Sequence, residues 1–308
     1  MNIVLLAGGT GGARLARGMA ASLDPRLLTV VTNTADDDTF FGLRVSPDTD
    51  SVLYHLAGCF NESRGFGVAG DTFHALGMLQ RLGETAWFQL GDRDIALQLQ
   101  REQLRRNGMS LSQAVGELAQ RLGIRCLVAP MSDDTVSTRI ATHSAELRFQ
   151  EWFVRERTLP EVRGIRFEGI ETARPSPAAM RAVAEADLVV VAPSNPLISI
   201  DPILAVLGPL PTAIPVVAVS PIVAGRALKG PLVRMLQQLG RDPSAAGIAR
   251  HYSGVATDFV LHTTDAGDAE TVASHGLRPH ILDTVMGGPA AEARLATALL
   301  GLFSPATA

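Results

Sequence analysis

Residues 3–12, Ile-Val-Leu-Leu-Ala-Gly-Gly-Thr-Gly-Gly, decide how this chain folds. The apolar run at 3–6 is short and continuous, which is typical of a buried strand, and the glycines that follow predict a tight turn. Residues 13–22 come next with Leu15 and Met19 at helical spacing, and a second apolar run covers 27–31. Strand, turn, helix and strand in this order predict the start of a doubly wound parallel sheet.

Later segments repeat this pattern. Apolar runs that suit further buried strands lie at 124–128, 188–191, 215–219 and 259–261, and helix-like stretches at 111–122 and 178–186 precede the first two. We therefore predict an α/β fold with a doubly wound, mostly parallel, Rossmann-like sheet, in a single domain over residues 1–308. Residues 138–174 alternate in places like antiparallel strands, and we predict that they form a smaller inserted subdomain.

The composition, net charge and cysteine content exclude several classes of protein. Hydrophobic residues make up 46% of the 308 residues and charged residues 19%, which indicates a globular chain rather than a disordered one. The net charge of −4 gives no reason to expect nucleic acid or an anionic membrane as a partner. Cys59 and Cys126 have no second thiol or histidine at ligand spacing, which excludes a disulfide framework or zinc site and favours the cytoplasm. The first apolar run is too short for a signal peptide or a membrane span.

The glycine-rich segment at 8–12 is the first candidate binding site. In an open parallel sheet, ligands bind beyond the carboxyl ends of the strands, and this segment follows the first strand. Its glycines let the backbone approach a phosphate, and the next helix offers free N–H groups to an anion. No Lys-Ser/Thr follows as in a Walker loop, and Arg14 stands where a dinucleotide fingerprint has its third glycine. A turn without a ligand is the alternative.

Acidic residues follow the second predicted strand. Residues 33–38 read Asn-Thr-Ala-Asp-Asp-Asp, and residues 46–50 read Ser-Pro-Asp-Thr-Asp. Carboxylates crowded in this way repel one another unless cations or donors neutralise them. Oxygen ligands of this kind suit Mg²⁺, which usually takes one or two carboxylates and substrate phosphates. We predict Mg²⁺ as the cofactor, with Asp37, Asp48 and Asp50 as its ligands. A solvated loop with helix-capping aspartates is the alternative.

Other strand ends carry similar signals. Residues 90–94 read Leu-Gly-Asp-Arg-Asp and residues 131–134 read Met-Ser-Asp-Asp. Each could be a cap or a turn alone, but at the strand ends of one sheet such carboxylates would converge. Residues 192–196, Ala-Pro-Ser-Asn-Pro, form a rigid turn that presents a hydroxyl and an amide, as a nucleotide-reading loop requires, or an ordinary proline-rich turn. Lys229, the one lysine among 27 Lys and Arg residues, lies near a glycine and suits either a phosphate or solvent.

These motifs, taken in order, resemble one family. They are Gly-Gly-Thr-Gly at 8–11, Asn-Thr-Ala at 33–35, Ser-Pro-Asp-Thr-Asp at 46–50, Leu-Gly-Asp-Arg-Asp at 90–94, Pro-Met-Ser-Asp-Asp at 130–134, Val-Ser-Thr at 136–138, Pro-Ser-Asn-Pro at 193–196 and Val-Ser-Pro-Ile at 219–222. Together they resemble the 2-phospho-L-lactate transferases (CofD/FbiA-like) of deazaflavin coenzyme biosynthesis. The order of the motifs over residues 1 to about 283 carries this resemblance, because no single motif is specific.

The resemblance implies an activity. A guanosine-diphospho donor with a lactyl, enolpyruvyl or glyceryl acid would pass its phospho-acid group to the ribityl 5′-hydroxyl of the deazaflavin Fo, and GMP would leave. Phosphoryl transfer depends mostly on positioning and charge neutralisation, so aspartates, Mg²⁺ and backbone donors suffice. The resemblance also implies small-molecule substrates and a homodimer.

The resemblance also suggests roles for individual residues. Asp50 would contact Fo and act in catalysis with Asp48. Gln89 falls where relatives carry a lysine that contacts Fo, so this chain lacks that charge. Trp152 or Phe153 would either cover the deazaflavin ring or lie in the core. The complete set of predicted substrate-binding residues is Asp50, Gln89, Gly9, Thr10, Gly11, Gly12, Asn33, Ser194, Asn195 and Lys229, of which Ser194 and Asn195 would hold the guanosyl part.

Two other classes of protein share part of this pattern. A non-catalytic nucleotide-sugar-binding regulator, similar to the YvcK group, would share the glycine-rich opening and the acidic segment. The motifs at 90–94 and 130–134 favour the transferase over this regulator. An NAD-dependent oxidoreductase lacks support, because the third glycine is absent and several carboxylates stand where one ribose-binding residue is expected.

Overall fold

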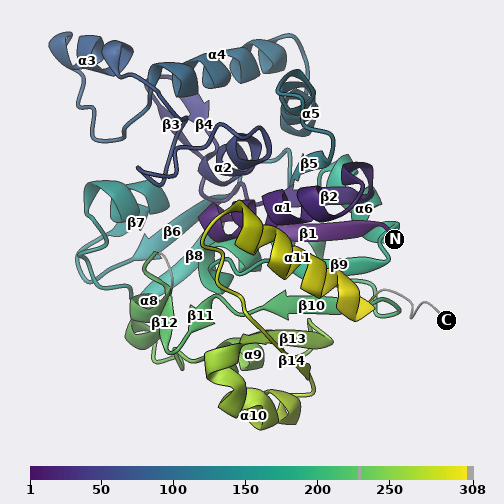
Figure 1. The fold of residues 1–308 in the computed structure, drawn as a ribbon. Coiled ribbons are helices and arrows are strands. Elements are labelled where there is room, and N and C mark those ends of the chain that lie inside the picture. The colour runs from purple at the N-terminus through teal and green to yellow at the C-terminus, as the bar shows by residue number, and fades with distance from the viewer. Residues whose placement is uncertain (228–229, 304–308) are drawn as a thin grey trace.

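The structure, a computed structural model, describes residues 1–227 and 230–303. Seven parallel strands form one central sheet in the order β14-β13-β10-β9-β1-β2-β5 (Figure 1). The chain starts in the middle at β1, adds two strands on one side, and then returns to add four on the other. The strands are β1 (Ile3–Ala7), β2 (Leu28–Thr32), β5 (Leu127–Pro130), β9 (Leu188–Val191), β10 (Val216–Val219), β13 (Asp258–His262) and β14 (Arg278–Leu282). This order confirms the predicted doubly wound α/β fold.

Helices cover both faces of the sheet. Alternate strand residues point to opposite faces, so Ile3 and Leu5 pack with α1, α2, α5 and α11, while Val4 and Leu6 face the layer of α6 to α10. This two-sided burial explains why the strands read as continuous apolar runs. The helices are α1 (Gly9–Ser22), α2 (Pro47–Leu56), α5 (Leu111–Arg121), α6 (Pro177–Ala184), α7 (Asp201–Leu207), α8 (Leu232–Gln238), α9 (Ala245–His251), α10 (Ala269–Ser274) and α11 (Pro289–Phe303).

The order of strands reverses between β1 and β9. These two strands are parallel neighbours, with Ile3 opposite Leu188. The connections after them leave in opposite directions, since the chain goes from β1 toward β2 and from β9 toward β10. A crevice therefore lies beyond their carboxyl ends, where doubly wound sheets bind ligands. The glycine-rich turn follows β1, and the short helix η3 (Pro196–Ile200) follows the turn after β9.

Two insertions surround this edge of the sheet (Figure 1). The first contains the hairpin β3 (Asp38–Phe40) and β4 (Leu43–Val45), and the helices α3 (His74–Arg81) and α4 (Asp92–Arg106). The second contains an antiparallel sheet of order β7-β6-β8, as the alternation in 138–174 predicts. The remaining short elements are η1 (Pro25–Leu27), β6 (Ser137–Ala141), β7 (Glu146–Arg148), η2 (Glu151–Arg155), β8 (Gly164–Glu168), β11 (Ile222–Val223), β12 (Arg226–Ala227) and η4 (Thr263–Asp268).

Two parts of the sheet differ from the sequence expectation. Strand β5 begins at Leu127 instead of 124, because Ile124 still closes the end of α5 through a hydrogen bond from its N–H to the carbonyl of Ala119 at 2.9 Å. Strand β14 was not predicted, since it is a half-exposed edge strand that contains Pro279. No helix in the described residues is long and apolar enough to cross a membrane.

The contact between α1 and α11 yields a test of the packing. A Cβ atom on Gly18 would lie 2.4 Å from the carbonyl oxygen of Glu292, so the two helices would have to separate. We expect Gly18→Ala to lower the free energy of unfolding by roughly 1–3 kcal/mol, the usual cost of overpacking. Gly116, inside α5, has open space at its Cβ position, so Gly116→Ala should raise the free energy of unfolding by roughly 0.5–1 kcal/mol. Urea unfolding measures both changes, and effects of the same sign would contradict this packing.

Candidate functional site

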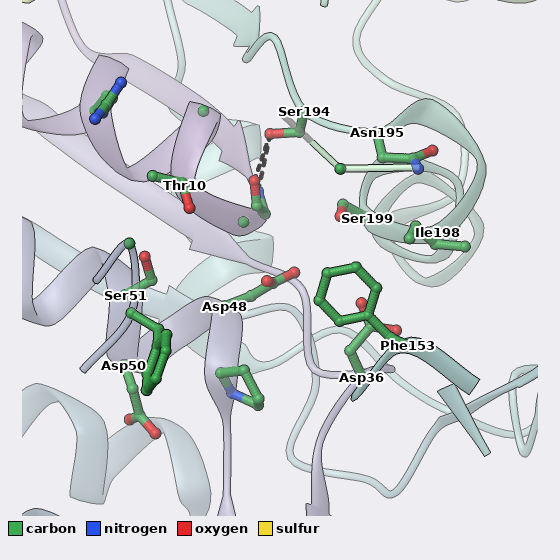
Figure 2. Close-up of a pocket in the computed structure, with 18 of the residues that line it drawn as sticks. Thr10, Asp36, Asp48, Asp50, Ser51, Phe153, Ser194, Asn195, Ile198 and Ser199 are labelled. Atoms are coloured by element: carbon green, nitrogen blue, oxygen red, sulfur yellow. Dashed lines mark hydrogen bonds between the residues drawn. The ribbon is translucent and has the colours of Figure 1, made fainter. Parts of the chain in front are cut away.

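A cavity of about 450 Å³ lies beyond the carboxyl ends of β1 and β9. Its wall combines the glycine-rich turn, the first turns of α2, the turn after β9, and parts of both insertions (Figure 2). Among the described residues, the charged side chains that line it are Asp36, Asp48, Asp50, Asp94 and Arg14. Aspartates therefore outnumber cationic side chains in the described wall of the cavity.

The glycine-rich turn packs against the turn after β9. A Cβ on Gly11 would lie 2.5 Å from the carbonyl oxygen of Pro193, and a Cβ on Gly8 would lie 2.5 Å from the Cβ of Ser199. The Ser194 hydroxyl accepts a hydrogen bond from the N–H of Gly8 at 3.2 Å and donates one to its carbonyl at 2.7 Å (Figure 2). These contacts fix the start of α1 beside the cavity, where its free N–H groups suit an anion.

Asp48 lies in the first turn of α2 and faces the glycine-rich turn. Asn33, directly after β2, donates a hydrogen bond from Nδ2 to Oδ2 of Asp48 at 3.0 Å. The other end of the Asn33 amide accepts a hydrogen bond from the N–H of Ala35 at 2.9 Å, so the amide is held from both ends. Asp48 is 8% exposed, and burial raises the pKa of its carboxyl above the ordinary value.

Asp36 points into the same part of the cavity as Asp48 (Figure 2). It is 4% exposed, and its Oδ1 atom has no hydrogen-bond partner in the described structure. Burial, followed by the charge of Asp48, raises the pKa of Asp36 well above the ordinary value. No ion pair to either carboxylate is found within residues 1–227 and 230–303. A cation would therefore stabilise both groups in their charged form.

Asp37 and Asp50, which stand near Asp36 and Asp48 in the sequence, each form an ion pair with an arginine. Asp37 does not line the cavity, and its Oδ2 accepts hydrogen bonds from Ser46 Oγ at 2.7 Å and from Arg44 Nε at 3.1 Å. Burial raises the pKa of Asp37 to about 6, and the charge of Arg44 opposes this shift.

Asp50 lines the cavity but is bonded to α4. Arg101, which is 1% exposed, donates from Nη1 to Oδ1 of Asp50 at 2.5 Å. Oδ2 of Asp50 accepts from Gln98 Nε2 at 2.9 Å and from the N–H of Ser46 at 3.2 Å. In Figure 2 the Asp50 carboxylate points away from Asp48. This buried pair ties α2 to α4, and loss of one partner from such a pair costs roughly 3–5 kcal/mol.

The structure thus brings Asp48 together with Asp36 rather than with Asp37. Within the part of the chain that the structure describes, no group of three or more His, Cys, Asp or Glu side chains is placed to hold a metal ion. Of the four aspartates that line the cavity, Asp50 is paired with Arg101 and Asp94 accepts a hydrogen bond from Tyr54, which leaves the pair Asp36 and Asp48 with neither contact. Mg²⁺ usually takes one or two carboxylates when phosphates supply further oxygens. Asp36 and Asp48 therefore fit a magnesium site. The sequence alone could not identify Asp36 as the aspartate that faces the cavity, because it is one of three consecutive aspartates.

The other predicted site residues divide between the cavity wall and its support. Gly12 and Asn33 lie behind the wall, against Ser194 and Asp48. Lys229 lies outside the described residues. The predicted residues that line the cavity, besides Asp48 and Asp50, are Gly9, Thr10, Gly11, Gln89, Ser194 and Asn195.

The carboxylates of the two remaining acidic motifs mostly cap helices. Asp92 accepts a hydrogen bond from the N–H of Ala75 at 2.9 Å in the first turn of α3, and Asp133 accepts one from the N–H of Ser112 at 2.6 Å at the start of α5. Asp92 and Asp133 therefore cap helices, which was the alternative prediction for these motifs, and neither lines the cavity. Asp134 accepts a hydrogen bond from the N–H of Arg174 at 2.9 Å, outside any helix. Asp94 is the one aspartate of these two motifs that lines the cavity, and it accepts a hydrogen bond from the Tyr54 hydroxyl at 2.6 Å.

Aromatic side chains provide an apolar wall. Trp152 belongs to the core, since it is fully buried and its Nε1 donates to the carbonyl of Pro160 at 2.9 Å. Phe153 is 39% exposed and lines the cavity beside Asp36 and Asp48 (Figure 2). It stacks on Phe149, with ring centroids 5.3 Å apart. Phe66 and Phe88 of the first insertion also line the cavity. Such rings suit a planar aromatic ligand.

Several known proteins resemble this chain in sequence or in fold. The family described as 2-phospho-L-lactate transferase CofD matches residues 3–294. A phosphoenolpyruvate transferase of Streptomyces griseus is 40% identical over 98% of both chains, and a 2-phospho-L-lactate transferase of Methanopyrus kandleri is 39% identical over 97% of both. A solved UPF0052-family protein of Bacillus halodurans has a TM-score of 0.62 at 14% identity, over 97% of this chain and 98% of that chain. This last likeness shows the fold alone.

Asp94 gives the stability of the protein a dependence on pH. Burial raises the pKa of Asp94 from 3.8 to about 6, so the folded state loses stability as the pH rises from about 4 through 6. Asn at this position cannot ionise. We expect the free energy of unfolding of Asp94→Asn, relative to the wild type, to rise by roughly 2–3 kcal/mol between pH 4 and pH 7. Chemical denaturation at both pH values measures this change, and an equal difference at the two values would contradict it.

Proposed function

The chain belongs to the 2-phospho-L-lactate transferase CofD family, and on this premise we propose that it is a magnesium-dependent transferase that acts on the deazaflavin Fo. Its donor is a guanosine-diphospho acid with a lactyl, enolpyruvyl or glyceryl group. The ribityl 5′-hydroxyl of Fo attacks the phosphorus that bears the acid, and a new oxygen–phosphorus bond forms. The bond from this phosphorus to the GMP oxygen breaks, the hydroxyl proton passes to solvent, and GMP leaves.

The observation that carries this proposal is the pair Asp36 and Asp48. Both carboxylates are buried in the cavity wall, and neither has an arginine partner in the described residues. Bound there, Mg²⁺ would neutralise them and hold phosphate oxygens, which supplies charge stabilisation in phosphoryl transfer. The N-terminus of α1, next to Asp48, offers backbone donors to the same phosphates.

The two ends of the cavity differ in chemistry, which supports a division between donor and acceptor. Ser194 and Asn195, in the turn after β9, line the cavity, and we propose that the guanosyl part lies there. Asp50 and Gln89 line it on the side of the first insertion, and we propose that Fo binds there. The Gln89 amide can hydrogen-bond Fo but brings no charge. Aromatic residues of both insertions then face the deazaflavin ring.

Relatives named for two different acids match this chain almost equally well, at 40% and 39% identity. A direct assay therefore offers all three donors. Purified protein with Mg²⁺ and Fo should release GMP and form a phosphodiester that mass spectrometry identifies. No GMP from any of the three donors would contradict the proposed function.

Asp48→Asn tests the role of the carboxylate pair. It keeps the size of the side chain but removes one of the two charges that would bind Mg²⁺, so we expect turnover to fall at least about 100-fold. Asp92→Asn is the matched control, because Asp92 caps α3 and does not line the cavity. Steady-state rates over a Mg²⁺ titration compare the two variants. Equal rates for Asp48→Asn and Asp92→Asn would remove the assigned role of Asp48.

A further inference from the structure

Arg14 is the one cationic side chain that lines the cavity within residues 1–227 and 230–303. Four aspartates line the same cavity, so this single positive charge stands out. Arg14 lies four residues after Thr10 on α1, and residues at this spacing share a helix face. Both side chains line the cavity. Arg14 stands at the position of the third glycine of a dinucleotide-binding motif, and it thus adds a positive charge to the cavity that glycine would not.

Other residues hold the Arg14 guanidinium in position. Its Nη1 donates to the carbonyl of Met286 at 3.0 Å, and its Nη2 donates to Oε2 of Glu62 at 2.9 Å. Glu292, fully buried on α11, lies 3.8 Å from Nε. Each terminal nitrogen of a guanidinium carries two N–H groups, so each keeps one for a ligand beyond these bonds. The Arg14 side chain is 22% exposed, which leaves it accessible from the cavity.

Ser51 adds a second polar group to the wall of the cavity. Its hydroxyl is buried and has no hydrogen-bond partner in the described structure, and the residue lines the cavity. Ser51 follows Asp48 by three residues on α2, so the two share a helix face. In Figure 2, Thr10 and Ser51 lie on one side of Asp48, while Asn195 and Ile198 lie on the other. Arg14 therefore shares a helix face with Thr10, and Thr10 lies on the same side of Asp48 as Ser51; we call these three cavity-lining residues the polar corner.

The donor of the proposed reaction carries a negative group besides its phosphates. The carboxylate of its acid is joined to the phosphorus through a carbon and an ester oxygen, so it lies only a few bonds from the phosphates. Because aspartates line much of the cavity, this carboxylate needs a cationic side chain as its partner. Arginine binds carboxylates through two parallel N–H···O bonds. Resting on the proposed function, we propose that Arg14 binds the carboxylate of the donor acid, with the hydroxyls of Thr10 and Ser51 as further donors. The corner of Thr10, Arg14 and Ser51 is then the acid subsite.

The chain offers a matched control for Arg14. Arg17, one turn further along α1, donates to Oε2 of Glu292 at 2.6 Å and to Oε1 of Glu62 at 2.7 Å. It does not line the cavity. Arg17→Gln therefore removes ion pairs with the same two glutamates but keeps the charge of Arg14 in the cavity. Any loss of stability common to both variants is then separated from loss of a ligand contact.

Calorimetry with Mg²⁺ and without Fo tests the proposal. One ligand is guanosine-diphospho-lactate, and the other is the ethyl ester of guanosine diphosphate, which differs only by the missing carboxylate. We expect wild type and Arg17→Gln to bind the lactyl ligand more tightly than the ethyl ligand. Arg14→Gln should lose roughly 10- to 100-fold in affinity for the lactyl ligand and little for the ethyl ligand. Arg14→Lys, which keeps the charge but not the planar fork, should retain part of the preference.

Each other outcome has a definite meaning. An equal loss for both ligands in Arg14→Gln would show that Arg14 serves the phosphates, which overturns the acid subsite. An unchanged preference for the lactyl ligand in Arg14→Gln would also overturn it. Should Arg14→Gln not fold, the comparison of Arg14→Lys with Arg17→Gln decides between the same outcomes. If wild type binds neither ligand, the proposed function fails together with this inference, a result distinct from binding without a lactyl preference.

Discussion

Two like charges buried in the wall of one cavity, Asp36 and Asp48, are the constraint on which the rest of the site depends. Burial raises the pKa of both carboxyls, and the charge of Asp48 raises that of Asp36 further. Their neighbours in sequence have arginine partners, Arg44 for Asp37 and Arg101 for Asp50. Neither Asp36 nor Asp48 has such a partner within the described residues, and we propose that a metal ion and a substrate complete their charge balance.

The fold holds this repulsive pair in place from several directions. The reversal of strand order puts the glycine-rich turn and the turn after β9 on the two sides of one crevice. Asn33 bonds Asp48 from the end of β2, and Ser194 joins the two turns through the backbone of Gly8. Arg101 anchors α2 to the first insertion through Asp50. Such fixed positions matter for phosphoryl transfer, where alignment of donor and acceptor supplies much of the rate.

The sequence predicts the central sheet well because its strands are buried on both faces and read as continuous apolar runs. The edge strand β14 has no such run, because its residues are only partly buried, and it could not be predicted from the sequence pattern. The two turns that line the cavity were predictable because they follow strands whose carboxyl ends meet at one edge. Which of the three successive aspartates at 36–38 faces the cavity was not predictable, because it depends on the direction of each side chain in the folded chain. No local pattern predicts the ion pair of Asp50 with Arg101, because the two residues are far apart in the sequence. For the same reason the position of Arg14 in the cavity wall could not be predicted, since distant segments form that wall.

The claim that a divalent ion joins Asp36 and Asp48 to the donor phosphates can be tested by locating the ion itself. Crystals grown with GDP and Mn²⁺ in place of Mg²⁺ would show the ion by its anomalous scattering. The account predicts one peak at coordination distance, about 2.0–2.3 Å, from a carboxylate oxygen of each aspartate and from a phosphate oxygen of GDP. A peak bound to Asp37 instead, or GDP bound with no ion between the two carboxylates, would contradict it.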